Sequence, residues 1–431
     1  MEYTQATIDS RVYLNTPKIN FLSFLCSLNL VLIFAGYQAS TVLLIPLGFG
    51  ASSQLVTIPY RIFAFAVTSC VLLINLFSPK IKREDISIPI VLYFICASLF
   101  LIRALVLSQS AGFFQIEGDP RKTFYFLFYG FLAPLSVFFS FRRINIRFTL
   151  ILAFFLIFFT SIFTVFFGVS DVGIFTSATD IRTGSTALFT IAVGYLGVSL
   201  YLLGLTISLE KSFNIVLRVI AAFGILFGIY TMLKSGSRSP LIAFVFVTFI
   251  FLFINRINLL LGMILLGFAG IFVYVFRFEL TTLTGYISPA IEARMNAFLF
   301  DGDSSGRLEL YAMAWKDFCE HPIFGTMQYS LPGYHSAIMD HFASMGFLFG
   351  ITMNVICIIS LFCAIEIVKL RKQFPYSYWL ALLSIMYFVY NMFFGALPFV
   401  SKYDWSSTII LVFMLAASFK KNRMAPRNYQ P

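Results

Sequence analysis

Long apolar runs separated by short polar connections make up most of the chain, from near residue 20 to near residue 419. Each run has roughly 17 to 25 residues, enough for a helix to cross a hydrocarbon core about 30 Å thick. The pattern therefore predicts an all-α, polytopic membrane protein with about 12 transmembrane helices. Their expected limits are residues 20–36, 57–77, 86–107, 123–141, 147–168, 185–207, 213–233, 239–254, 257–276, 341–368, 376–397 and 404–419. Residues 40–50 are apolar but short and interrupted by Pro46, so they form either a re-entrant segment or an extension of the first helix.

One connection is much longer than the rest and covers residues 277–340. Apolar residues recur within it at helical spacing until Pro322, and Ser304 and Ser305 precede them as candidate N-caps. We therefore expect an amphipathic helix lying at the membrane surface. Its apolar face would be formed by Leu308, Tyr311, Trp315 and Phe318. Because no linker separates a second unit, residues 1–431 are predicted to form a single integral membrane domain.

Lys and Arg residues gather in alternate connections, which is typical of the cytoplasmic side of a membrane protein. The residues concerned are Lys80, Lys82, Arg83, Arg142, Arg143, Arg147, Lys369, Arg371 and Lys372, with Lys420, Lys421 and Arg423 in the tail. This distribution predicts that both termini are cytoplasmic and that the connection 277–340 lies on the outer side of the membrane.

Composition agrees with a membrane location, because 59% of the residues are hydrophobic and only 11% are charged. A net charge of +11 could indicate nucleic-acid binding, but the basic residues lie between predicted spans, where they set orientation, so no nucleic acid is expected. Five of the six cysteines fall in apolar runs and Cys319 stands alone in the long connection. Neither a disulfide framework nor a zinc site is indicated.

Arginines on the predicted outer side run against this charge pattern and suggest an anionic ligand. Arg238 lies in SGSRSP, where Ser239 can cap the eighth span and Pro240 suits its first turn. An outward-facing helix N-terminus with a neighbouring guanidinium attracts phosphate. The alternative is an interfacial arginine that reaches lipid headgroups.

Two further arginines share this setting. Arg182 lies in DIRTGSTALFT, immediately before the sixth span, and repeats the arrangement around Arg238. The two helix starts would form a diphosphate cradle if the sixth and eighth spans were neighbours, which the sequence alone does not show. Arg307 opens the helix of the long connection and could act as a clamp, or it could be a solvated charge paired with Glu309 or Asp303.

His335 is the candidate proton acceptor, because it follows the helix-breaking PGY and precedes an apolar helix. His321 is expected at the C-terminus of the preceding helix, and His341 could pair with Asp340. The three histidines are too scattered for metal-ligand spacing and no carboxylate cluster accompanies them. We therefore expect a metal-independent site without a cofactor.

Four motifs, in this order, carry a resemblance to a known family: DIRTGSTALFTIAVGY, SGSRSPLIAFV, SSGRLELYAMAWKDFCEHPIFG and GYHSAIMDHFASMGFLFG. The set resembles the O-antigen ligase and polymerase superfamily over roughly residues 170–360. That family usually has Asn directly after the loop histidine, whereas this chain has Ser336. The difference affects the local hydrogen bonding of His335.

The resemblance implies a C-type glycosyltransferase of the bacterial inner membrane that uses an undecaprenyl-diphosphate-linked glycan donor at the periplasmic face. Carried onto this chain, it implies that Arg182, Arg238 and Arg307 hold the donor diphosphate and that His335 activates the acceptor hydroxyl. The acceptor is another lipid-linked repeat unit in a polymerase and the lipid A core in a ligase. The degenerate motifs favour the polymerase. A flippase and a chain-length regulator are the implied partners, besides membrane lipids.

Two other classes of protein remain as alternatives. A transporter or flippase for lipid-linked sugars could also use outer arginines, but alternating access favours polar residues near mid-membrane, and the predicted span centres are almost purely aliphatic and aromatic. A non-enzymatic membrane scaffold would have no need for His335.

Overall fold

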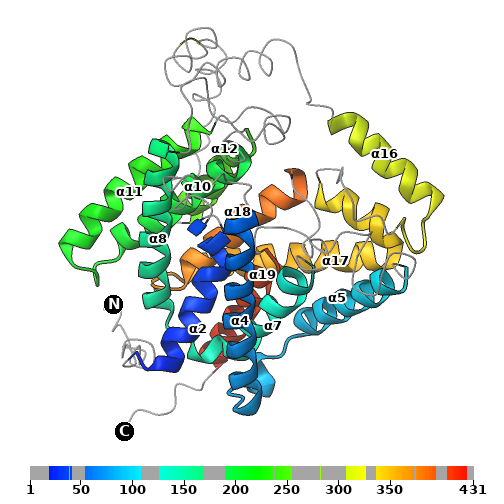
Figure 1. Cartoon of the computed structure of the whole chain (residues 1–431), viewed down its shortest axis with the longest axis horizontal. Helices are drawn as coiled ribbons and strands as arrows, with labels where there is room; N and C mark the ends of the chain where they lie inside the picture. The colour runs from blue at the N-terminus through cyan, green and yellow to red at the C-terminus, as the bar shows by residue number, and fades with distance from the viewer. Residues whose placement is uncertain are drawn as a thin grey trace, which may run out of the picture.

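The computed structural model describes residues 19–37, 39–40, 54–107, 126–167, 190–235, 238–254, 282, 307–326, 336–372, 375–394 and 405–424. Over these residues the chain is all-helical and contains no strand. The α-helices are α2 (Phe21–Val31), α4 (Gln54–Phe77), α5 (Ile88–Leu107), α7 (Ala133–Ser140), α8 (Ile146–Phe167), α10 (Thr190–Leu209), α11 (Ile215–Lys234), α12 (Arg238–Ile254), α16 (Arg307–Glu320), α17 (Ala337–Lys369), α18 (Tyr378–Phe394) and α19 (Trp405–Met424) (Figure 1).

The apolar helices follow the predicted spans closely. Four of them, in α4, α8, α11 and α17, are long and apolar enough to cross a membrane by length and composition. Six shorter apolar helices coincide with the predicted spans 20–36, 86–107, 185–207, 239–254, 376–397 and 404–419. The span 257–276 lies outside the described residues. The all-helical membrane class is thereby supported, whereas the total of twelve spans stays a prediction.

The predicted span 123–141 is helical but not uniformly α-helical. Its first part is the π-helical segment η5 (Phe126–Leu132), which continues directly into α7, and α2 likewise continues into the π-helical segment η1 (Leu32–Gly36). Wider π turns leave carbonyl groups open to other donors. The Tyr93 hydroxyl donates to the Gly130 carbonyl at 2.8 Å, and the Tyr60 hydroxyl donates to the Leu32 carbonyl at 2.9 Å.

Asparagine side chains cap the N-termini of three of the described helices. Asn20, Asn145 and Asn214 each accept a hydrogen bond through Oδ1 from a backbone amide three residues further on, at the beginning of α2, α8 and α11. Such caps satisfy amides that a helix start leaves unpaired. All three lie at connections that the charge pattern places on the cytoplasmic side.

A buried polar network joins α2, α4 and α7. The Asn29 amide donates to Ser136 Oγ at 3.0 Å, and the Thr68 hydroxyl donates to Asn29 Oδ1 at 2.7 Å. In an apolar bundle such bonds hold helices together because the same groups would find no partner in lipid. Asn29 lies inside the predicted span 20–36, so the span centres are less uniformly apolar than the sequence analysis expected.

Helices α10 and α11 pack with their backbones in contact. A Cβ atom added at Gly197 would lie against the Gly228 carbonyl oxygen, and one at Gly228 would lie against the Gly197 carbonyl oxygen. A Cβ atom at Gly204, two helical turns further along α10, would likewise lie against the Ala221 carbonyl oxygen. Small residues at such spacing allow the close helix approach that membrane bundles use.

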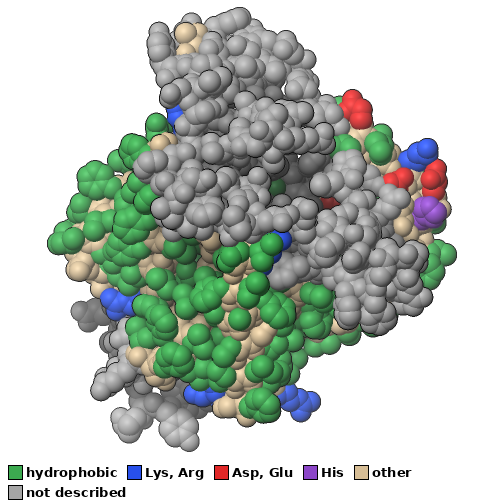
Figure 2. All heavy atoms as spheres, viewed as in Figure 1, with side chains coloured by type: hydrophobic (Ala, Val, Ile, Leu, Met, Phe, Trp, Pro, Cys, Tyr) green, Lys and Arg blue, Asp and Glu red, His purple; other side chains and the backbone are tan. Residues whose placement is uncertain are grey.

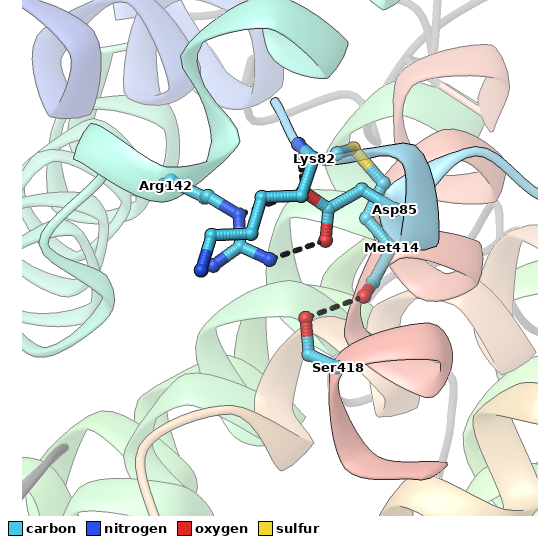
Figure 3. Close-up of polar contacts among 5 residues, drawn as sticks. All are labelled: Lys82, Asp85, Arg142, Met414 and Ser418. Carbon is cyan, nitrogen blue, oxygen red and sulfur yellow. Dashed lines mark hydrogen bonds and ion pairs between the residues drawn. The ribbon is translucent and has the colours of Figure 1, made fainter. Parts of the chain in front are cut away.

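Polar contacts tie the basic connections together at one end of the bundle. Asp85 is almost wholly buried and receives two hydrogen bonds from the Arg142 guanidinium, at 2.7 and 2.6 Å, and one from the Lys82 amide at 2.9 Å (Figure 3). Burial by itself raises the pKa of Asp85, but the bonds and charges of Arg142 and Lys82 outweigh it, so this pKa lies below its ordinary value. We call this contact the Asp85–Arg142 pair.

Other arginines of the predicted cytoplasmic connections make contacts at the same end. Arg143 donates to Asn75 and to Ser78 at 2.6–2.8 Å, and the Arg147 guanidinium lies 5.1 Å from the ring centre of Phe213 and 5.3 Å from that of Tyr376. Four connections that the charge pattern assigns to one side thus meet one another. Which side of a membrane this end faces stays a prediction.

The outer surface of the bundle is apolar. Figure 2 shows hydrophobic side chains over most of the described face, while acidic and histidine side chains gather over α16. Phe223 and Leu226 of α11 are 63% and 66% exposed, and Phe77 of α4 is 87% exposed. An aqueous protein does not expose aromatic surface on this scale, whereas hydrocarbon would cover it favourably.

Candidate functional site

Two of the four predicted site residues open helices. Arg238 is the first residue of α12 and Arg307 is the first residue of α16. Their side chains are not among the described ones, and Arg182 and His335 lie outside the described residues. The helix start at Arg238 comes one residue earlier than predicted, so Ser239 lies within the first turn together with Pro240 instead of capping it.

The neighbouring sixth and eighth spans that a diphosphate cradle requires are present. Helix α10 packs against α12, and a Cβ atom at Gly194 would overlap the ring of Pro240 and lie 2.8 Å from Ser235 Oγ. Only glycine allows this approach. The turn that carries Arg238 therefore lies directly against the first turns of the helix that follows Arg182.

The segment that follows His335 is fixed to the C-terminal end of α18. Ser336 is the N-cap residue of α17, and its hydroxyl donates to the Met392 carbonyl at 2.7 Å. Half a turn earlier in α18, the ring centre of Tyr390 lies 4.3 Å from that of Tyr195 in α10. The starts of α10, α12 and α17 and the end of α18 thus converge, and we call this region the four-helix end.

Helix α17 is not a single rod. Gly346 has φ +76° and ψ −174°, and the chain reverses there. A Cβ atom at Gly350 would lie 2.9 Å from the His341 carbonyl oxygen, although in a straight helix these residues would be about 13 Å apart along the axis. The leading segment, residues 337–345, therefore folds back along the remainder of α17, as the two antiparallel stretches in Figure 1 show. The predicted span 341–368 falls within α17, but its first residues lie in the leading segment, before the reversal.

A turn after α16 completes the reversal. The Phe347 amide donates to the Pro322 carbonyl at 2.8 Å, and the Thr326 amide donates to the Ala343 carbonyl at 2.7 Å. In an uninterrupted helix Phe347 and Ala343 would bond to each other, so the turn replaces the bond that the break removes. Gly325, with φ +69°, allows the turn to approach the backbone of Ser344.

A helix is present where the amphipathic helix was predicted, as α16, whereas its position at a membrane surface stays a prediction. Its Ala314 packs in a buried cluster with Ala343 of the leading segment, and the Phe318 ring centre lies 5.6 Å from that of Phe342. Leu308 and Trp315, which belong to the predicted apolar face, are 67% and 60% exposed. The protein leaves this part of the face uncovered, as a helix resting on a membrane surface would require.

His341 has a partner that the sequence analysis did not foresee. Its Nδ1 lies 2.7 Å from Oδ1 of Asn354, and the side chains are 0% and 8% exposed. Asn354 is a polar residue inside an apolar run, which was the one available signal. The contact could not be read from spacing because it depends on the reversal at Gly346.

An apolar groove lies between α8 and α11. It is lined by Phe158, Ile162, Phe166, Phe223, Leu226, Phe227 and Tyr230. Apart from Phe223, these residues occupy the second half of each helix, and in α11 that half leads to the turn before Arg238.

Within the described part of the chain, no group of three or more His, Cys, Asp or Glu residues is placed to hold a metal ion.

The backbone amide of His321 donates to the Asp317 carbonyl at the end of α16, which agrees with the expected position of His321 at the C-terminus of that helix.

Comparison with known proteins gives a family for the central part of the chain. Residues 222–344 match the family model described as O-antigen ligase. The matched segment contains the second half of α11, α12, α16 and most of the leading segment, together with Arg238, Arg307 and His335. Among curated proteins no match is found. The match supports a ligase- or polymerase-like enzyme of the glycosyltransferase kind without distinguishing the two reactions. Together with the apolar helices, it supports a membrane protein that is similar, over this segment, to the O-antigen ligase and polymerase superfamily.

Proposed function

We propose that this protein is an O-antigen polymerase, which joins undecaprenyl-diphosphate-linked repeat units at the periplasmic face of the bacterial inner membrane. The observation that carries the proposal is the family match over residues 222–344, because this segment contains Arg238, Arg307 and His335. The four-helix end is the proposed site. Helix α10, which follows Arg182 in the sequence, packs against α12 at this end, which supports including Arg182 in the proposed site.

The proposed reaction is a glycosyl transfer with electrostatic and general-base catalysis. A hydroxyl of the acceptor sugar gives its proton to His335 and its oxygen forms a bond to the anomeric carbon of the donor. The bond between that carbon and the diphosphate oxygen breaks, and undecaprenyl diphosphate leaves with the electron pair. Arg182, Arg238 and Arg307 stabilise the negative charge that develops on it.

Helix geometry supports these roles. Arg238 and Arg307 each begin a helix, so a bound diphosphate would meet free backbone amides and the positive end of the helix dipole beside each guanidinium. His335 directly precedes the N-cap residue Ser336, which is held on α18. The apolar groove between α8 and α11 gives the polyprenyl chain of the donor a place on the lipid-facing side.

One observation favours a second candidate, because the family model that matches is described as O-antigen ligase. A ligase would transfer the finished polymer from undecaprenyl diphosphate to the lipid A core. The donor, the leaving group and the proposed residues would be the same, and only the acceptor would differ.

Deletion of the gene in its native host, followed by gel display of the surface polysaccharide, separates the candidates. A lipid A core that carries a single repeat unit supports the polymerase. Bare core together with accumulated lipid-linked polymer supports the ligase. An unchanged polysaccharide pattern contradicts both.

Complementation with variants tests the site. We expect Arg238→Ala to lose more activity than Arg238→Lys, because Lys keeps the charge but loses the bidentate hydrogen bonds to phosphate. His335→Ala should fail to restore the polysaccharide. A matched control is Arg218→Ala, since Arg218 bonds to the Ser208 carbonyl at the opposite end of α11. Full activity of both Arg238 variants removes the diphosphate role, and full activity of His335→Ala removes the general base.

A further inference from the structure

The leading segment of α17 is held from three sides, and each contact comes from a different element. Ser336 bonds to α18 at the start of the segment, and Ala343 packs on α16 at its flank. The third contact is internal to α17, where His341 bonds to Asn354 across the reversal. This last contact is a side-chain hydrogen bond that joins the leading segment directly to the rest of the helix.

The contact between His341 and Asn354 has a defined polarity. Asn354 Oδ1 can only accept a hydrogen bond, so Nδ1 of His341 carries the proton and donates it. Burial makes the bond strong, because no water competes for either group. Gly350 adds to the closeness of the two stretches, since any side chain there would press on His341 and Phe342.

Neither of the other common roles for a buried histidine fits this one. The described residues provide no metal-binding group that includes His341. The side chain is 0% exposed, so it does not touch a substrate in this arrangement. Its position in the leading segment, six residues after His335 in the sequence, points to a mechanical role.

We propose that His341 and Asn354 form a clamp that fixes the leading segment of α17 in its folded-back position and thereby positions His335 for the reaction. His341 is a positioning residue, not a catalytic one. The claim that the clamp positions His335 for the reaction rests on the proposed function. The claim that the clamp holds the leading segment in its folded-back position does not.

The clamp is tested with His341→Leu, which removes the hydrogen bond, and His341→Gln, which keeps a side-chain donor near Asn354. Amide hydrogen exchange of the peptide 337–345 reports the leading segment directly and needs no activity. Loss of one buried bond should raise local opening, and hence exchange, by about tenfold in His341→Leu. Exchange in α19 should not change, and His341→Gln should resemble the wild type.

Activity is measured on the same purified variants as consumption of the lipid-linked donor. We expect His341→Leu to lower kcat at least tenfold with little effect on KM, and His341→Gln to restore most of it. His321→Gln is the matched control, because His321 is exposed at the end of α16. If His341→Leu does not fold, Asn354→Leu and Asn354→Asp replace the pair, since Asp keeps the acceptor oxygen.

Three results would overturn the proposal. Unchanged exchange in both leucine variants means that no clamp exists. Lost activity with unchanged exchange, or no rescue by His341→Gln, means that His341 acts chemically. Faster exchange with full activity means that the segment does not position His335. If the wild type itself consumes no lipid-linked donor, the proposed function fails, while the exchange result still decides whether the clamp is present.

Discussion

Removal of Arg142 would leave a buried carboxylate without its main partner. The Asp85 side chain is 1% exposed and the Arg142 side chain 29%. Taking one partner from a buried pair costs about 3–5 kcal/mol, and the low end applies here because Arg142 is partly exposed and the Lys82 amide still donates to Asp85. We therefore expect Arg142→Ala to lower the free energy of unfolding by about 3 kcal/mol. Arg142→Lys should cost less, because it keeps the charge but loses the paired geometry.

Thermal unfolding in detergent, followed by tryptophan fluorescence, measures this loss. Trp379 and Trp405 are both 0% exposed, so their emission reports the bundle interior. Entropy of unfolding grows with chain length, and for a protein of this size about 3 kcal/mol corresponds to a fall in Tm of roughly 3–6 °C. The double variant Asp85→Ala with Arg142→Ala should be more stable than Arg142→Ala alone, because no carboxylate is left unpaired.

The same pair predicts a pH dependence. The pKa of Asp85 is lower in the folded protein than in the unfolded chain, where it is about 3.9. Its stabilisation is therefore complete at neutral pH and is lost as the pH falls through the folded pKa. The Tm advantage of the wild type over Asp85→Asn should shrink below about pH 4. Equal Tm values for Arg142→Ala and the double variant, or a pH-independent advantage, would refute the reasoning.

Three further predictions concern packing, the interior network and the groove. Gly228→Leu should destabilise the α10–α11 contact by about 3 kcal/mol and lower the yield of folded protein, whereas Val219→Leu on the exposed face of α11 should not. Thr68→Val removes a donor from the buried asparagine of α2 and should cost about 1 kcal/mol in thermal unfolding, against no change for Thr352→Val, whose hydroxyl bonds to its own helix. Leu226→Trp fills the groove and should slow use of the undecaprenyl-linked donor more than use of a short-chain analogue; equal slowing would remove the groove from the binding site.

The sequence predicted most helices because long apolar runs leave little choice of structure in a membrane. It also located the α16 helix, whose apolar spacing ends at Pro322. It could not locate the reversal in α17, because Gly346 stands in an apolar run where a helix would tolerate it. The turn that stabilises the reversal lies some twenty residues upstream, and such a non-local contact leaves no periodic signal.

The candidate site was predictable in its parts but not in its assembly. Helix starts close to Arg238 and at Arg307 were predicted from local sequence, although Ser239 lies inside the first turn of α12 and does not cap it. Helices α10 and α12 are neighbours because Gly194 lets Pro240 approach closely. The sequence shows a glycine in a span but does not show which helix packs against it. The pairing of His341 with Asn354 was missed for the same reason, since thirteen residues separate them.

The reversal at Gly346 has a consequence for exchanging segments between relatives of this protein. The turn 321–326 and the break in α17 share hydrogen bonds, so each completes the backbone of the other. In a chimera whose junction falls between them, the turn and the break would come from different proteins, and their shared hydrogen bonds and packing would not match. Residues 307–354 therefore form the smallest cassette that could be transplanted intact, and substrate preference carried by α16 or by the start of α17 should move only with the whole of it.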